Sequence, residues 1–156
     1  MRKQIAAFLF GLGLAAAVLI PAGRVHAALG EAEGSVSSDE NALSAKRVSK
    51  TVFSGYTVKQ IDSDAISVRE YVTQTGLIFA VAWNGVAHPD LTPLLGRYAD
   101  EYENSLKNAK RKHGHRQFHV ETSRIVVEKW GQMRNLQGRA YIPALIPAGV
   151  TVDEIR

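Results

Sequence analysis

Three histidines in the C-terminal half are the residues whose type is best suited to chemistry: His113, His115 and His119. Neutral imidazoles at this spacing can bind Cu, Ni or Zn. Residues 110–116, however, also include four basic side chains, whose charge opposes a divalent cation, and no carboxylate is nearer than Glu121. A solvated basic turn is the favoured interpretation. A metal-binding or hydrolytic protein that uses this histidine cluster stays the alternative.

The remaining candidates for catalysis are weak. His88 and Asp90, together with some serine, form the single formal pairing of a base with a nucleophile. They lie where a strand is expected to pass into a helix, and Asp90 is expected to cap that helix. There is no Gly-x-Ser-x-Gly elbow and no cysteine, which excludes thiol nucleophiles and thiolate metal sites. We therefore predict a non-enzymatic protein with no catalytic residues, no resident metal and no cofactor.

A binding role is the stronger hypothesis, because tryptophan, tyrosine and arginine most often dominate the binding energy of protein interfaces. Five such residues lie on predicted strands, and they converge on one patch if the strands belong to one sheet. The alternative is core packing with a cation–π contact. The predicted binding residues are Arg69, Tyr71, Trp83, Arg139 and Tyr141.

A charged residue also falls on an apolar strand face. Alternation places Glu70 on the same face as Val68, so one face of this strand combines a carboxylate with apolar side chains. A buried carboxylate is costly unless it is paired. We therefore expect Glu70 either near the rim of the sheet or in an ion pair with Arg124, Arg134 or Arg139.

Six β-rich runs are expected to position these residues. The third run is apolar on both faces and is therefore predicted to be central. Its residues Ala80 and Ala82 share the less bulky face, where a helix could approach closely, while Phe79, Val81 and Trp83 share the other. The predicted strands are 53–61, 65–73, 77–83, 117–121, 124–130 and 133–141.

The clearest predicted helix covers residues 91–106, because its apolar residues recur with a period of 3.6. Asp90 or Thr92 can cap it, and it should end by Gly114. A short N-terminal helix is predicted over residues 39–49. With the proline-containing tail 141–150 running extended over the core, the order of elements predicts a single α+β domain with helices on one face of an antiparallel sheet.

The first 27 residues have the pattern of a secretory signal peptide. A basic start is followed by an apolar run, and Val25 and Ala27 occupy the −3 and −1 positions of a cleavage site after Ala27. The mature chain would then have 129 residues, and loss of three basic residues would reduce its net charge from +4 to +1. Residues 28–38 are predicted to form a flexible arm, because they contain almost no large apolar side chain. The compact domain is expected over residues 39–156.

An exported chain without cysteine has no site for lipid attachment, and no second apolar run of about 20 residues follows the first. We therefore expect a periplasmic or secreted protein with no membrane span after processing. Its charge is uneven: residues 28–103 carry 6 basic and 11 acidic groups, whereas 104–156 carry 10 and 4. The partner is predicted to be an envelope or secreted protein, or an anionic envelope component. Nucleic acid is not expected, because the mature charge is near zero.

Several runs together resemble a family of small exported bacterial proteins known only as a domain of unknown function. The likeness extends over nearly the whole mature chain. It implies export and a single compact domain, and it implies no activity, ligand or catalytic residue. The runs that carry it are GYTV (55–58), VREYV (68–72), FAVAWNG (79–85), PDL (89–91), LLGRY (94–98) and GRAYIP (138–143).

Overall fold

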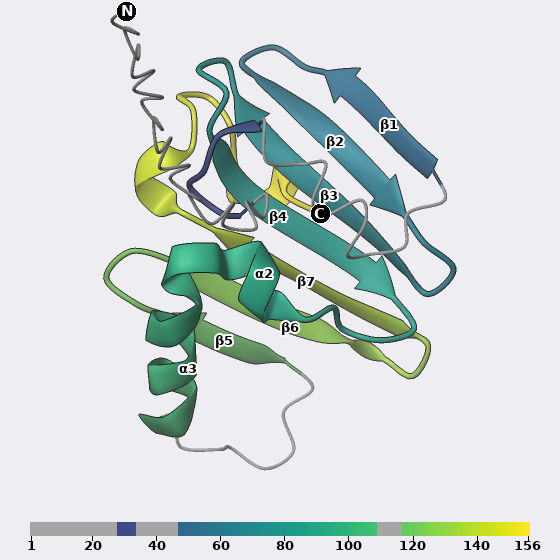
Figure 1. Ribbon diagram of the computed structural model, residues 1–156, viewed down its shortest axis with the longest axis vertical. Helices are drawn as coiled ribbons and strands as arrows, with labels where there is room; N and C mark the ends of the chain where they lie inside the picture. The colour runs from purple at the N-terminus through teal and green to yellow at the C-terminus, as the bar shows by residue number, and fades with distance from the viewer. Residues whose placement is uncertain (1–27, 34–46, 109–116) are drawn as a thin grey trace, which may run out of the picture.

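The described part of the chain forms a seven-stranded antiparallel sheet and one 18-residue helix, which confirms the predicted α+β fold (Figure 1). The structure, a computed structural model, describes residues 28–33, 47–108 and 117–156. The strands pair in the order β1-β2-β3-β4-β7-β6-β5. Two meanders therefore meet where β4 pairs with β7, and the helix connects β4 to the far edge strand β5. The strands are β1 (Arg47–Val52), β2 (Tyr56–Asp62), β3 (Ile66–Thr73), β4 (Ile78–Gly85), β5 (Phe118–Glu121), β6 (Val126–Gln132) and β7 (Asn135–Tyr141).

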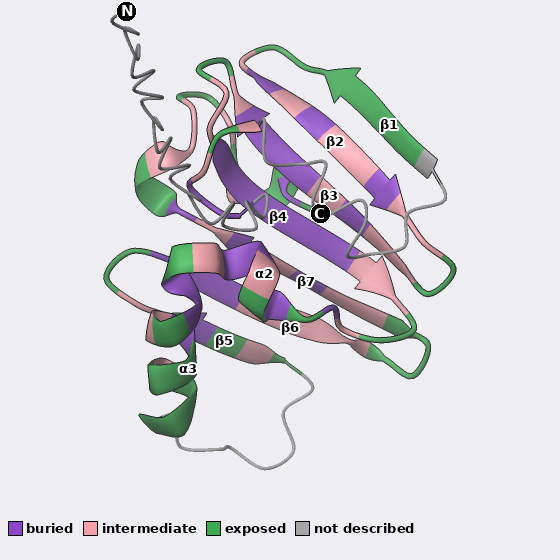
Figure 2. Cartoon of the chain, in the orientation of Figure 1, coloured by how far each residue is buried: buried purple, intermediate pink, exposed green. Residues whose placement is uncertain are grey.

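Strand β1 differs from the sequence prediction. A short helix was expected over residues 39–49, but residues 47–49 belong to β1, and 39–46 lie outside the described residues. The six residues of β1 pair with β2 along their whole length, with Val48 opposite Ile61. A weak helical pattern is outweighed here, because a β-hairpin supplies backbone hydrogen bonds to a strand that is rich in β-branched residues. The result is an exposed edge strand, green in Figure 2.

The long helix follows its predicted pattern. It consists of α2 (Leu91–Leu95), a 3₁₀ turn η2 (Gly96–Tyr98) and α3 (Ala99–Asn108). The Asp90 side chain accepts a hydrogen bond of 2.9 Å from the backbone N–H of Thr92, so Asp90 is the N-cap. Leu91, Leu94, Leu95, Tyr98 and Tyr102 are all buried against the sheet. The helix therefore seals the core with the residues that the periodicity indicates.

Residues 28–33 are ordered against the core, which differs from the flexible arm predicted over 28–38. Leu29 is fully buried, and its N–H donates to the carbonyl of Leu94. Gly30 and Glu31 exchange backbone hydrogen bonds with Ile78 at the start of β4. A single large apolar side chain and three backbone hydrogen bonds thus offset a composition that otherwise favours disorder. Residues 34–38 lie outside the described part of the chain.

The helix covers the face of the sheet that carries Val81 and Trp83, which we name the helix face. The prediction that it approaches the Ala80 and Ala82 face is wrong. The register between β3 and β4 shifts at a β-bulge, where Tyr71 is opposite Ala80 but Val72 is opposite Ile78. The bulge also moves Phe79 from the predicted face to that of the alanines. Strict alternation cannot reveal a bulge, so Phe79 was assigned to the wrong face, whereas Val81 and Trp83 were correctly separated from Ala80 and Ala82.

The opposite face, named here the tail face, carries the C-terminal segment 143–156. This segment contains two short 3₁₀ helices, η3 (Pro143–Leu145) and η4 (Val152–Glu154). Ile155 is fully buried and packs with Tyr56, Tyr71 and Phe79. The tail therefore lies over the core as predicted, but it is folded into short 3₁₀ turns instead of running extended. No helix within the described residues has the length and apolar character needed to cross a membrane.

Candidate functional site

Polar side chains share the tail face beside the C-terminal segment. The strand register places one row across the sheet, running Gln60, Arg69, Ala82, Arg139 and Glu128. The neighbouring row contains Asn84, Gln137 and Trp130. We name the part of this face around Gln60, Arg69, Asn84, Trp130 and Gln137 the open half, and the part around Tyr56, Tyr71, Phe79 and Ile155 the covered half. The residue types of the open half suit binding more than core packing.

Arg69 is held in place by neutral groups. Its Nε donates to Gln60 Oε1 at 3.3 Å, and its Nη2 donates to Asn84 Oδ1 at 3.1 Å. Within the described residues no carboxylate forms an ion pair with it. Arg124, by contrast, pairs with Glu101. Arg69 is therefore an oriented, half-buried cation that forms no ion pair with a carboxylate of the described residues.

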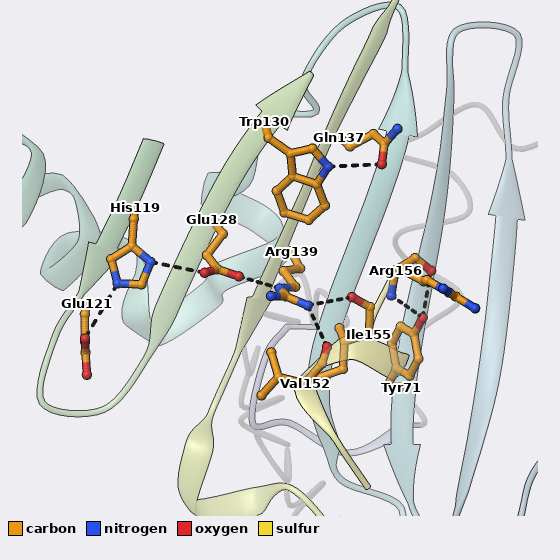
Figure 3. Close-up of polar contacts among 10 residues, drawn as sticks. All are labelled: Tyr71, His119, Glu121, Glu128, Trp130, Gln137, Arg139, Val152, Ile155 and Arg156. Atoms are coloured by element: carbon orange, nitrogen blue, oxygen red, sulfur yellow. Dashed lines mark hydrogen bonds and ion pairs between the residues drawn. The ribbon is translucent and has the colours of Figure 1, made fainter. Parts of the chain in front are cut away.

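Arg139 is engaged on both sides (Figure 3). Its Nε forms an ion pair with Glu128 Oε2, and its Nη1 donates to the carbonyls of Val152, at 2.6 Å, and Ile155, at 3.4 Å. Glu128 also contacts His119 Nδ1 at 3.2 Å. Arg139 thus neutralises Glu128 and fastens the C-terminal turn to the sheet. Its role is positioning more than contact with a ligand.

Tyr71 fastens the turn from the other side. Its hydroxyl accepts a 3.0 Å hydrogen bond from the N–H of Arg156 and lies 2.9 Å from the carbonyl of the same residue. The turn is also shaped internally, because Thr151 and Glu154 form a reciprocal capping box. Burial, and then a hydrogen bond to Glu154, raise the pKa of Tyr56. These contacts fix Arg156 at the border between the two halves of the tail face.

A hollow of about 410 Å³ lies in the open half. Its walls are formed by Arg69, Asn84, Trp130, Gln137 and Arg156, above a floor where β4 and β7 pair. A second hollow, also of about 410 Å³, adjoins it and shares Arg69 and Arg156. Together the two hollows are named the groove, and Arg69 and Arg156 line both of its parts.

Trp130 separates the first hollow from another one near β5, since it lines both. Its Nε1 donates to Gln137 Oε1 at 3.1 Å, and the guanidinium carbon of Arg139 lies 5.6 Å from the ring centroid. Sequence analysis missed this residue. The signal was present, because Trp130 shares strand parity with Glu128, which is opposite Arg139, but the register needed to use it was unknown.

Four of the five predicted binding residues lie on the tail face: Arg69, Tyr71, Arg139 and Tyr141. Trp83 does not join them, because it lies on the helix face and is 2% exposed. Its Nε1 donates to His88 Nδ1 at 3.0 Å. Tyr71 and Tyr141 pack in the covered half. Of the five, Arg69 lines the first hollow from the tail face, and the buried Trp83 borders its floor beside Gly138. Trp130 takes the place predicted for Trp83.

The other sequence candidates are spread over the molecule. Burial, and then the charge of Lys129, lower the pKa of His88, while Asp90 caps the helix. His119 lies between Glu121 and Glu128, whereas His113 and His115 lie outside the described residues. Among the residues that the structure describes, no group of three histidine, aspartate or glutamate side chains could hold a metal ion.

Glu70 is fully buried on the helix face, so the prediction that it lies near the rim is wrong. In the sheet it is opposite Lys59 on one side and Val81 on the other. Two of the three predicted partners form ion pairs elsewhere: Arg124 with Glu101, and Arg139 with Glu128 on the opposite face. Glu70 is therefore part of the core and does not line the hollow.

Comparison with known proteins identifies the family. A family model described as a protein of unknown function (DUF2844) matches residues 25–155, so the chain belongs to that family. No curated protein and no solved structure matches the chain.

Proposed function

We propose that this DUF2844 protein is an exported, non-enzymatic binding module that acts in the periplasm or outside the cell. Its partner is an envelope component or a secreted protein, and its binding site is the open half of the tail face. One observation carries the proposal: Arg69 is oriented by two amide side chains and has no paired carboxylate among the described residues. An arginine placed in this way is suited to an anionic partner.

Rigidity supports this site. Most of its side chains belong to central strands, and its border is a turn fastened by Arg139 on one side and Tyr71 on the other. A preorganised site loses less conformational entropy when it binds. The helix face, by comparison, is filled with buried apolar side chains and offers little surface to a partner.

Export is proposed from the signal-like residues 1–27. Cleavage after Ala27 would leave intact the buried segment that begins with Ala28 and Leu29. The released domain would therefore keep the contacts with Leu94 and Ile78 described above. The mass of the exported protein tests this step, and a mass that includes residues 1–27 contradicts it.

Crosslinking in the intact envelope tests the binding role. We expect Arg69→Ala to abolish recovery of the crosslinked partner while the melting temperature changes little. Arg139→Ala should lower the melting temperature, because the ion pair with Glu128 and the contacts to the turn are lost. Lys107→Ala, on an exposed position of the helix, is the charge-matched control.

Recovery of the same partner with Arg69→Ala as with the wild-type protein contradicts the proposed site. Loss of stability with Arg69→Ala would instead assign Arg69 to the fold. In that case recovery measured at low temperature, where the variant stays folded, decides whether Arg69 also contacts the partner.

A further inference from the structure

We propose that the hollow between Arg69, Trp130 and Arg156 binds a sugar ring that carries a carboxylate group, as in an acidic glycan. This inference rests on the proposed function and names the chemistry of its ligand. Three features of the hollow carry it: the unused donors of Arg69, the charge around them, and the fixed plane of Trp130.

Arg69 has unused donors with the geometry of a carboxylate. A guanidinium group offers five N–H donors in one plane, and Arg69 uses its Nε and one Nη2 donor for Gln60 and Asn84. Three donors remain, two on Nη1 and one on Nη2, which is enough for a bidentate pair with a carboxylate. The amide groups also hold the plane of the guanidinium still, so little side-chain entropy remains to be lost on binding.

The surroundings favour a single negative charge. Arg156 adds a second basic residue to the lining of the hollow. Gln60, however, also donates to Asp62 at 2.9 Å, so a carboxylate lies close behind Arg69. Glu154 lines the adjoining hollow, where it accepts a hydrogen bond from Tyr56. These acidic groups reduce the local positive potential, which suits a carboxylate better than a doubly charged phosphate.

Trp130 supplies a flat apolar surface whose orientation is fixed by its neighbours. Arg139 stacks on the indole, and the bond from Nε1 to Gln137 fixes the ring edge. The C–H face of a pyranose ring packs on such an aromatic surface, while the sugar hydroxyls need polar groups around it. Asn84 and Gln137 provide them, because each amide keeps donor or acceptor capacity beyond the bonds described.

The size of the groove agrees with a chain of sugars. A hollow of about 410 Å³ falls within the range of small-ligand sites, about 300–1,000 Å³. The adjoining hollow shares Arg69 and Arg156, so a second ring can lie beyond the first along the groove. Phe53, which is 48% exposed, offers it aromatic surface there, and its ring stacks on that of Tyr56 with ring centroids 5.0 Å apart. A short acidic oligomer therefore matches the site better than a single sugar.

The test is a titration of the mature protein with a short oligomer of galacturonic acid, followed by calorimetry and tryptophan fluorescence. We expect a neutral galactose oligomer of equal length to bind at least tenfold more weakly. Arg69→Gln, Arg156→Gln and Trp130→Leu should each weaken binding of the acidic oligomer at least tenfold. Lys107→Gln, which removes the same charge from the exposed end of the helix, should change it less than twofold.

Each other outcome overturns the inference in an identifiable way. Equal affinity for the acidic and neutral oligomers excludes the carboxylate contact. Equal loss with Lys107→Gln indicates diffuse attraction to charge instead of a site. Inorganic phosphate that competes with the acidic oligomer, with no effect of Trp130→Leu, indicates a simple anion site without a sugar contact.

The ligand class and the proposed function can also be separated. If no oligomer binds but the envelope crosslink still depends on Arg69, the ligand class is wrong and the binding role stands. If neither depends on Arg69, the proposed function fails as well. The Arg156→Gln variant is expected to fold normally, because this side chain is exposed and forms no hydrogen bond or ion pair within the described residues.

Discussion

The two faces of the sheet are closed in different ways. The helix face is covered by an amphipathic helix and by Leu29, and it buries Trp83 among aliphatic side chains. The tail face is covered over only one half, by a short segment whose anchor is Ile155. Both faces are built by the same seven strands. Alternate residues of each strand point to opposite faces. The difference therefore depends on which of the two sets is apolar, and on the length of the element that packs on each face.

This contrast indicates that the two faces of the sheet have different roles. A long helix supplies enough apolar area to stabilise one face completely, since burial contributes roughly 25 cal/mol per Å². The other face can then present polar groups at little cost to stability. Its turn is fastened by hydrogen bonds from Tyr71 and Arg139, which hold the border of the hollow in a defined position. Stability and the candidate site are thus located on opposite sides of one sheet.

The largest expected effect lies on the helix face. Leu95→Ala should lower the free energy of unfolding by about 2–5 kcal/mol, because Leu95 is 1% exposed and its removal leaves a cavity under the helix. Chemical unfolding measures the change, with Lys107→Ala as the control. A loss as small as that of the control would show that the helix is not what stabilises this face.

A smaller effect is expected on the tail face. Ile155→Ala removes a fully buried side chain as well, but it lies in a short turn that can shift into the space. We expect a loss in the lower part of the range of about 2–5 kcal/mol for such truncations. Faster proteolysis of residues 143–156 should accompany it. A loss larger than that of Leu95→Ala would break the comparison, because the tail would then be the main cover of the sheet.

Much of the fold could be predicted from the sequence. The helix is defined by an apolar period and an Asp90 cap, both of which are local. Six strands are defined by β-rich runs between turn residues, and each was located to within a few residues. The missed elements depend on distant partners. β1 forms by pairing with the free edge of β2. Residues 28–33 are ordered because they form backbone hydrogen bonds with Leu94 and Ile78.

The candidate site was less predictable, because it depends on register. Arg69 and Tyr71 share one face of β3, as alternation indicates, but the bulge at Tyr71 and the packing of Trp83 under the helix could not be read from alternation. Trp130 and Gln137 become neighbours of Arg69 only through the β4–β7 pairing. Arg156 reaches the same place through segment 143–156, whose regular structure consists of two short 3₁₀ helices. Pairing between strands distant in sequence carries this information, and a single sequence contains little of it.

The smallest expected effect sharpens the comparison through pH, and it concerns His88 on the helix face. An indole N–H can only donate, so the Nδ1 atom of His88 accepts from Trp83 and the neutral ring carries its hydrogen on Nε2. A further proton must bind at Nδ1 and break this bond. Burial, followed by the charge of Lys129, accordingly lowers the pKa of His88.

The sign of the pH effect follows from this lowered pKa. The folded protein binds the proton less tightly than the unfolded chain, whose histidine pKa is about 6.5. Stability from this group is therefore complete above about pH 6.5 and is lost as the pH falls through the lowered value. Glu33 and Glu101 also have lowered pKa values, but the stability that they contribute is lost at more acidic pH, below about 4.3.

Urea unfolding at pH 7.5 and pH 5.0 tests this effect. The free energy of unfolding should fall more for the wild-type protein than for His88→Gln, in which the amide oxygen can accept from Trp83 at both pH values. An equal loss in the two proteins would place the acid sensitivity outside the contact between Trp83 and His88 and would reverse this part of the comparison.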